Sequence, residues 1–240
     1  RAHAGLAVAA RPSDHVKRAV EVVLAATAIA VSLPISLPLA MLVWLQDPGP
    51  LLVAKVAVMR AGRSFHQLKL RSMVKNAEGA TGPVPAAPDD RRVTWVGSLL
   101  RRTHIDELPQ VINIARGEMS FVGPRPERTV FVARHLATIP GYAGRHVVRP
   151  GLAGMAQVFG DYYSTPSQKL RYDLLYIRRR SLALDCKLFA SAVLLALFGA
   201  QPGGPSRRRR RTRRYEPARW RRAYAALRGE AAPDAPDTEE

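Results

Sequence analysis

The sequence predicts a mostly helical α+β protein. A re-entrant membrane helix hairpin precedes a small cytoplasmic domain, and amphipathic helices lie at the membrane interface. Three observations support this fold class: an uncharged apolar run near the N-terminus, mixed strand and helix patterns after it, and arginines gathered near the C-terminus. We therefore divide the 240 residues into a leader (1–16), a re-entrant membrane helix (17–48), a folded domain (49–200) and a basic, disordered tail (201–240).

The apolar run carries the membrane prediction. Val22–Leu45 contains no charged residue, and as a straight helix it would be about 36 Å long, enough to cross the hydrocarbon core. Pro34 and Pro38 lie inside it and should bend the helix. These residues alone leave open a kinked spanning helix or a hairpin that enters and leaves on one face.

Basic residues on both sides of the run favour the hairpin. Lys17 and Arg18 precede it. The positive-inside rule places such clusters on the cytoplasmic side, and a spanning helix would leave one of the two clusters on the wrong side. The second cluster follows the run and consists of Lys55, Arg60, Arg63, Lys69 and Arg71.

The remaining elements are predicted from apolar periodicity and from Gly- and Pro-rich segments. Residues 51–75 begin with a strand-rich stretch, and the Gly, Pro, Ala and Asp of 76–92 indicate a mobile surface loop. Residues 168–180 have helical spacing, with an apolar face opposite basic residues. The apolar segment 188–198 is too short to span a membrane, and suits a core helix or an interfacial one.

Composition limits the partners. The net charge of +18 requires a polyanionic neighbour, which can be nucleic acid, an anionic membrane face or a phosphorylated substrate. Cys186 is the only cysteine, so an intrachain disulfide is impossible and a cysteine-based zinc site is not expected. Aromatic residues are not interleaved with basic ones as in nucleic-acid-binding segments, so nucleic acid is not the favoured partner.

Two adjacent carboxylates are the strongest candidate for chemistry. Asp106 and Glu107 precede Pro109, a residue tolerated in a first helical turn, so both are expected at a helix N-terminus. One carboxylate could attack phosphorus while the other holds Mg²⁺, which proteins bind through one or two carboxylates and phosphate oxygens. Taken alone, such a pair is more often an acidic cap on a surface helix.

Arginine and lysine side chains near this pair are candidate phosphate ligands. Two prolines fix the backbone around Arg125, which presets its guanidinium for bidentate contact with a phosphate. Lys69, Arg71 and Arg102 offer the same charge. For each of the four, a solvated surface side chain is the alternative interpretation.

Taken in order, these motifs resemble the bacterial sugar transferase family, the monotopic polyprenyl-phosphate phosphoglycosyl transferases. The resemblance runs from about Lys17 to Gly199. It rests on Lys17-Arg18, Pro34, Gly49-Pro50, KLRSM (69–73), RRTHIDELPQ (101–110), GEMSFVGPRP (117–126), RPGLAG (149–154), Gln157, Tyr172-Asp173, Tyr176 and SLALD (181–185).

The resemblance implies a reaction and a place for it. Such enzymes move a sugar-1-phosphate from a nucleotide diphosphate sugar, here expected to be a UDP-sugar, to a polyprenyl phosphate of the undecaprenyl type. The products are a polyprenyl-diphosphate sugar and a nucleoside monophosphate. This is the first membrane step of exopolysaccharide, O-antigen or other glycan assembly. The resemblance also implies that the protein is monotopic and lies on the cytoplasmic face of the bacterial inner membrane, in contact with anionic lipids.

The resemblance also implies residue roles. Asp106 would be the nucleophile that forms a phosphosugar-aspartyl intermediate, and Glu107 would bind the Mg²⁺ cofactor. Arg125 would bind a phosphate, with Lys69, Arg71 and Arg102 as further phosphate ligands. The matching Asp173 and Tyr176 would support the site.

Some positions depart from the family pattern. Leu33 stands where a Ser or Thr often precedes the mid-run proline, Glu21 replaces an aspartate, and 53–58 lacks the usual Arg-Gln pair. These changes motivate an alternative, a non-catalytic membrane scaffold of a glycan assembly complex. The tail, with an unbroken arginine run at 207–211, is expected to add a membrane contact.

Overall fold

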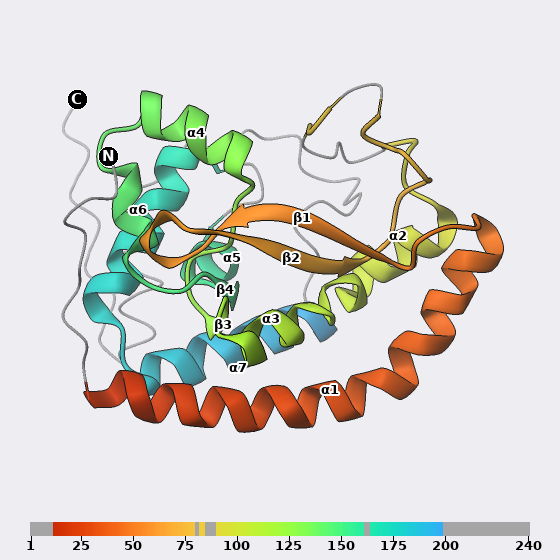
Figure 1. The fold of residues 1–240 in the computed structure, drawn as a ribbon. Coiled ribbons are helices and arrows are strands. Elements are labelled where there is room, and N and C mark those ends of the chain that lie inside the picture. The colour runs from red at the N-terminus through yellow and green to blue at the C-terminus, as the bar shows by residue number, and fades with distance from the viewer. Residues whose placement is uncertain (1–11, 80–81, 85–89, 161–163, 199–240) are drawn as a thin grey trace, which may run out of the picture.

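The chain begins with one long helix, α1 (Pro12–Gln46), which the computed structural model places along one edge of the molecule. Figure 1 shows the helix running along the bottom of the view and bending upward in its second half, which contains Pro34 and Pro38. Both prolines disrupt the hydrogen bonding of a helix interior, so a bend there is expected. The structure describes residues 12–79, 82–84, 90–160 and 164–198.

The helix begins earlier than the sequence indicates. Residues 12–16, predicted as part of a loose leader, form its first turn. Pro12 and Asp14 both favour a helix start, because proline is preorganised for the first position and a carboxylate stabilises the positive end of the helix dipole. The predictions for residues 1–11 and for the tail at 201–240 lie outside the described residues.

A two-stranded antiparallel hairpin follows α1. β1 (Leu52–Val58) pairs with β2 (Ser64–Leu70) from Leu52 opposite Leu70 to Val58 opposite Ser64. The 3-10 turn η1 (Arg60–Gly62) joins the two strands. The strand-rich stretch expected after residue 50 is therefore confirmed.

Three short helical elements then lead across the hairpin. α2 (Trp95–Thr103) begins after Thr94, whose hydroxyl accepts a hydrogen bond from the Gly97 amide at 2.9 Å. The 3-10 turn η2 (Ile105–Glu107) follows directly, and α3 (Gln110–Arg116) ends at a left-handed glycine. Glycine adopts that conformation at low cost, which explains the end of α3.

The second half of the domain is built around two short parallel strands. β3 (Ser120–Val122) pairs with β4 (Gly151–Ala153), and the segment between them contains α4 (Thr129–Thr138) and the 3-10 turn η3 (Tyr142–Val147).

Three helices complete the described chain: α5 (Met155–Phe159), α6 (Pro166–Arg179) and α7 (Leu182–Phe198). The helix predicted at 168–180 is confirmed as α6, which starts at a complete capping box on Thr165. The apolar segment at 188–198 is the later part of α7, which starts six residues earlier than predicted.

Both halves of α1 pack against the same domain. Ala25, in the first half, lies in a core with Phe65 of the hairpin and Ile114 of α3. Val43, near the other end, packs with Leu70 and Leu100. The fold is mostly helical with a few strands, as predicted.

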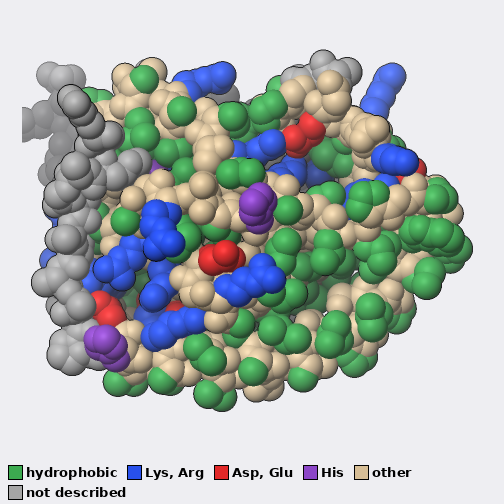
Figure 2. All heavy atoms as spheres, in the orientation of Figure 1, with side chains coloured by type: hydrophobic (Ala, Val, Ile, Leu, Met, Phe, Trp, Pro, Cys, Tyr) green, Lys and Arg blue, Asp and Glu red, His purple; other side chains and the backbone are tan. Residues whose placement is uncertain are grey.

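The rest of the α1 surface is apolar and exposed. Among the described residues, α1 is the one helix long and apolar enough to cross a membrane. In Figure 2 hydrophobic side chains cover the edge of the molecule that α1 forms, while lysines and arginines gather on the domain above its first turns. The exposed apolar side chains of α1 include Val23, Val31, Leu33, Ile35, Leu37, Met41, Trp44 and Leu45.

Candidate active site

The two candidate carboxylates lie in the turn between α2 and α3. Asp106 and Glu107 belong to η2, and both are buried, each with 7% of its surface exposed. The expected helix N-terminus lies later: α3 begins at Gln110, and Pro109 is its N-cap. Pro109 has no amide hydrogen and disfavours a continuous α-helix through this point, so the carboxylates occupy a 3-10 turn just before the helix.

Glu107 is held by two basic side chains. Lys69 Nζ of β2 lies 2.6 Å from Glu107 Oε1, and Arg125 donates to both carboxylate oxygens, with Nη1 at 3.2 Å from Oε2. Burial would raise the pKa of Glu107, but the charges and hydrogen bonds of Arg125 and Lys69 outweigh it and hold this pKa well below its usual range. Glu107 is therefore an anion at any physiological pH.

Asp106 has the opposite environment. No described residue makes a hydrogen bond or ion pair with its carboxylate, although Lys69, Arg101 and Arg125 act on it at longer range. Burial, assisted by the charge of Glu107, raises the pKa of Asp106 in spite of these cations. A carboxylate that is desolvated and not engaged in hydrogen bonds is available to a ligand or an electrophile.

The Arg125 loop is fixed by close backbone packing. Gly123 donates its amide hydrogen to the Ala153 carbonyl at 2.9 Å, and Gly151 donates to the Pro124 carbonyl at 2.8 Å. A Cβ on Gly151 would lie 2.0 Å from the Gly123 nitrogen, so a larger residue cannot replace glycine here without moving the loop. The two glycines thus hold Arg125 above Glu107.

A buried ion pair supports the same loop from behind. Arg145 Nε donates to Asp173 Oδ2 at 2.9 Å, and Arg145 Nη2 donates to the Arg125 carbonyl oxygen at 2.8 Å. Burial raises the pKa of Asp173 to about 6, although Arg145 lowers it. The predicted supporting residue Asp173 is therefore connected to the site through Arg145, a residue that the sequence did not single out.

Amide side chains connect α3 to β2. Asn113, fully buried, accepts from the Leu68 amide at 3.0 Å and donates to the His66 carbonyl at 2.8 Å. Gln67 Nε2 donates to Gln110 Oε1 at 3.0 Å. These contacts fix the register between the strand carrying Lys69 and the turn carrying Glu107. Asn and Gln residues in the first turns of a helix that follows a strand are a sequence pattern that could have identified these contacts.

Three other predicted residues lie away from the carboxylates. Arg71 is buried and its Nη1 lies 3.0 Å from Asp47 Oδ2, so it fastens the end of α1 to β2. Arg102 is exposed on α2 and no hydrogen bond or ion pair joins it to either carboxylate. The charge of the neighbouring Arg101, by contrast, lowers the pKa of Asp106. Tyr176 donates to Asp185 Oδ1 at 2.8 Å beneath β3.

Comparisons with known proteins agree with this arrangement. Residues 12–199 match the family described as bacterial sugar transferase. The chain is 39% identical over 191 residues to a protein of Aeromonas hydrophila named UDP-N-acetylgalactosamine-undecaprenyl-phosphate N-acetylgalactosaminephosphotransferase, covering 78% of this chain and 45% of that protein. It is 41% identical over 182 residues to the UDP-glucose:undecaprenyl-phosphate glucose-1-phosphate transferase of Caulobacter vibrioides, covering 74% of this chain and 68% of that relative.

The other relatives differ in length and in name. The chain matches 39% of the length of the UDP-glucose:undecaprenyl-phosphate glucose-1-phosphate transferase of Escherichia coli, at 38% identity. It matches 94% of the exopolysaccharide production protein PSS of Rhizobium leguminosarum, at 32% identity. The chain thus spans less than half of several relatives and nearly all of another. This chain belongs to the bacterial sugar transferase family.

Proposed function

We propose that this protein transfers a sugar-1-phosphate from a UDP-sugar to undecaprenyl phosphate. The observation that carries the proposal is the asymmetric carboxylate pair, in which Glu107 is neutralised by Lys69 and Arg125 while no described residue makes a hydrogen bond with the Asp106 carboxylate. Relatives named for this reaction on two different sugars support it. The relative named for exopolysaccharide production supports a role early in glycan assembly.

In the proposed mechanism Asp106 acts as the nucleophile. One carboxylate oxygen attacks the phosphorus that bears the sugar. The bond from this phosphorus to the bridging oxygen breaks, so uridine monophosphate leaves and an aspartyl phosphosugar remains. An oxygen of undecaprenyl phosphate then attacks the same phosphorus, which forms the diphosphate product and releases Asp106. Lys69 and Arg125 lie where they can offset the negative charge of the approaching phosphates.

We further propose Mg²⁺ as the cofactor. Two adjacent carboxylates are hard oxygen donors, and substrate phosphates would complete the coordination. Asp106 offers an unengaged carboxylate, whereas Glu107 has to give up part of its contact with Lys69 or Arg125 to reach a metal. When bound, the ion would neutralise charge on the diphosphate.

The membrane topology in this proposal is re-entrant. Arg18, near the start of α1, donates to the Ile114 carbonyl at 2.7 Å, and Asp47, just after its end, pairs with Arg71. Both ends are therefore fastened to one folded domain, which cannot lie on both sides of a bilayer. This supports a monotopic protein on the cytoplasmic face, with the acceptor phosphate presented at the interface.

The nucleophile assignment is tested by Asp106→Asn in purified protein with a UDP-sugar and undecaprenyl phosphate. We expect a loss of at least a thousandfold in uridine monophosphate release, because an amide is a poor nucleophile. Mass spectrometry of the unsubstituted protein with donor alone should detect a phosphosugar adduct on Asp106. Asp14, a half-buried aspartate that pairs with Arg180 away from the carboxylate turn, provides the control, since Asp14→Asn should keep both signals. Full turnover by Asp106→Asn would refute the mechanism, and a folded protein inactive with every donor would favour the scaffold alternative.

The metal requirement is tested by chelation. EDTA should stop turnover, and excess Mg²⁺ should restore it, because the charge of the diphosphate is then again neutralised. Titration of Mg²⁺ into protein with donor gives the apparent affinity. Undiminished turnover in EDTA would remove the metal from the mechanism.

A further inference from the structure

A second charged site lies at the opposite end of α1 from the bend. It is a pocket of about 70 Å³ between the first turns of α1, the η1 turn, the segment before β4 and the junction of α6 with α7. Its lining includes Lys17, Arg60, Arg149, Arg180 and Asp185, and neither Asp106 nor Glu107 is part of it. The catalytic assignment therefore does not account for this pocket.

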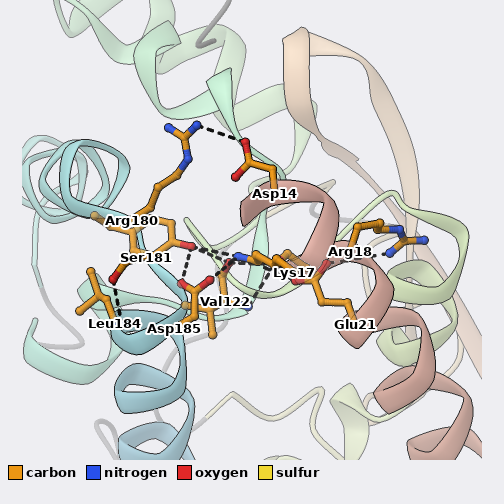
Figure 3. Close-up of polar contacts among 11 residues, drawn as sticks. Asp14, Lys17, Arg18, Glu21, Val122, Arg180, Ser181, Leu184 and Asp185 are labelled. Atoms are coloured by element: carbon orange, nitrogen blue, oxygen red, sulfur yellow. Dashed lines mark hydrogen bonds and ion pairs between the residues drawn. The ribbon is translucent and has the colours of Figure 1, made fainter. Parts of the chain in front are cut away.

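The carboxylates of the pocket are already engaged. Asp185 lies 2.8 Å from Lys17 Nζ, and Asp14 lies 3.4 Å from Arg180 Nη2. Glu21 is buried and accepts a short hydrogen bond from Ser120. Figure 3 shows Arg180 facing Asp14, and the Lys17 side chain reaching toward Asp185 and Val122.

Two arginines of the pocket have no such partner. No described carboxylate forms an ion pair with Arg60 or Arg149 within 4.0 Å, and Arg149 Nε donates to the Gly117 carbonyl at 2.9 Å. Burial, the charge of Arg18 and, less strongly, the charge of Arg60 lower the pKa of Arg149, against the opposing charges of Glu21 and Asp14. Two arginines that line one pocket without a carboxylate partner among the described residues indicate a place for an anion.

The position of the pocket relative to the apolar part of α1 indicates which kind of anion it would bind. Lys17 lies on the lining, and the uncharged run of α1, with exposed Val23 and Leu24, begins within about two helical turns of it. When that surface lies in hydrocarbon, the pocket lies at the depth of the lipid headgroups. The basic group that Figure 2 shows above the first turns of α1 lies in the same region.

We propose that this pocket binds the phosphate of an anionic phospholipid headgroup, with Arg60 and Arg149 as its ligands. The planar guanidinium groups suit phosphate oxygens, and the lipid chains would lie along the first apolar turns of α1. This inference rests on the proposed membrane embedding of α1. It assigns these arginines a role in seating the helix that is independent of the transfer chemistry.

The test uses full-length protein in detergent micelles, titrated with dihexanoyl phosphatidylglycerol while the melting temperature is followed. We expect a saturable rise for the unsubstituted protein. The apparent affinity should fall about fivefold for Arg60→Gln and about 25-fold for Arg60→Gln with Arg149→Gln, as expected from the usual contribution of a basic residue at an anionic surface. The matched control is Arg63→Gln with Arg134→Gln, which removes equal charge from exposed sites outside the pocket and should bind normally.

The outcomes separate the possible ligands. An affinity equal to that of the control pair in both pocket variants would overturn the proposal. Arg60→Gln alone suffices for this test, because no described residue makes a hydrogen bond or ion pair with the exposed Arg60 side chain. A rise in melting temperature with inorganic phosphate alone, or with farnesyl phosphate but not phosphatidylglycerol, would overturn the phospholipid assignment. Asp106→Asn should keep the lipid response without turnover, and the pocket variants should show the reverse. Failure of this inference is thus distinguishable from failure of the transferase proposal.

Discussion

Two neighbouring carboxylates acquire different properties from their contacts. Glu107 meets Lys69 and Arg125 directly, and its pKa is held low. Asp106 is buried without a hydrogen bond from a described residue, and its pKa is raised. Environments that separate the pKa values of paired acids are a common basis for separate catalytic roles. The sequence alone gives an Asp-Glu pair and no means of telling the two apart.

The raised pKa of Asp106 predicts the pH dependence of transfer. Only the ionised carboxylate can attack, so the rate should fall as the pH drops through this raised pKa, and the acidic limb should lie above that of an ordinary aspartate. Lys69→Gln removes a cation that lowers the pKa of Asp106, so the limb should move to still higher pH. The measurement is the pH profile of kcat/KM, with Lys55→Gln as the control on β1.

Lys55 forms its ion pair with Glu78, not with either catalytic carboxylate. Its replacement should leave the acidic limb in place. An identical pH profile of kcat/KM for the unsubstituted protein and the Lys69→Gln variant would show that the ionisation of Asp106 does not determine the acidic limb.

At the scale of elements, the site depends on the contact between β2 and α3. Lys69 and Glu107 come from separate elements. The buried side-chain amide of Asn113 accepts from the Leu68 amide and donates to the His66 carbonyl, both on β2. The strand and the turn therefore act as one rigid support for the ion pair. This arrangement is typical of sites whose geometry must be preset.

Asn113→Ala should lower the free energy of unfolding by about 3 kcal/mol, because it leaves buried backbone groups of His66 and Leu68 without partners. Urea denaturation followed by circular dichroism measures the change. The control is Thr138→Ala on the exposed end of α4, where the hydroxyl bonds only its own helix, with an expected change within about 0.5 kcal/mol. Equal stability of the two variants would mean that Asn113 does not fix this contact.

The elements were predictable where a local pattern dominates. The apolar spacing of α6 and the strand pattern of β1 identified both correctly, because each has one buried face. The helix expected at Asp106 was misplaced because Pro109 limits the hydrogen bonding of the turn before it. Arg145 was missed because its partners lie far away in sequence, and only the fold brings Asp173 and the Arg125 carbonyl to it.

At the scale of the whole molecule, Arg71 and Glu21 make contacts that their positions in the sequence did not indicate. Both belong to the attachment of α1: Arg71 fastens the end near Asp47, and Glu21 bonds Ser120 of β3. The sequence shows charged residues at each end of an apolar run, but not what they contact. Together these contacts hold a long exposed apolar helix against a charged domain (Figure 1).

Cysteine labelling tests the proposed topology. Cys186 is exposed, so it is first replaced by serine, and single cysteines are then placed at His15 and Leu51. Both should react from the cytoplasmic side in sealed vesicles, since both ends of α1 join one domain. A cysteine at Val31, which is 63% exposed on the apolar surface of α1, should react with neither side. Labelling of His15 and Leu51 positions from opposite sides would establish a spanning helix instead.

The fastening of both ends of α1 to one domain has a consequence for bilayer thickness. A spanning helix must match the full hydrocarbon thickness, and mismatch costs free energy for each ångström. A helix that turns back and returns to the leaflet it entered meets only that leaflet, so the opposite leaflet imposes no length on it. In the re-entrant topology proposed above, turnover should therefore vary little between thin and thick bilayers and respond mainly to the lipids of a single leaflet.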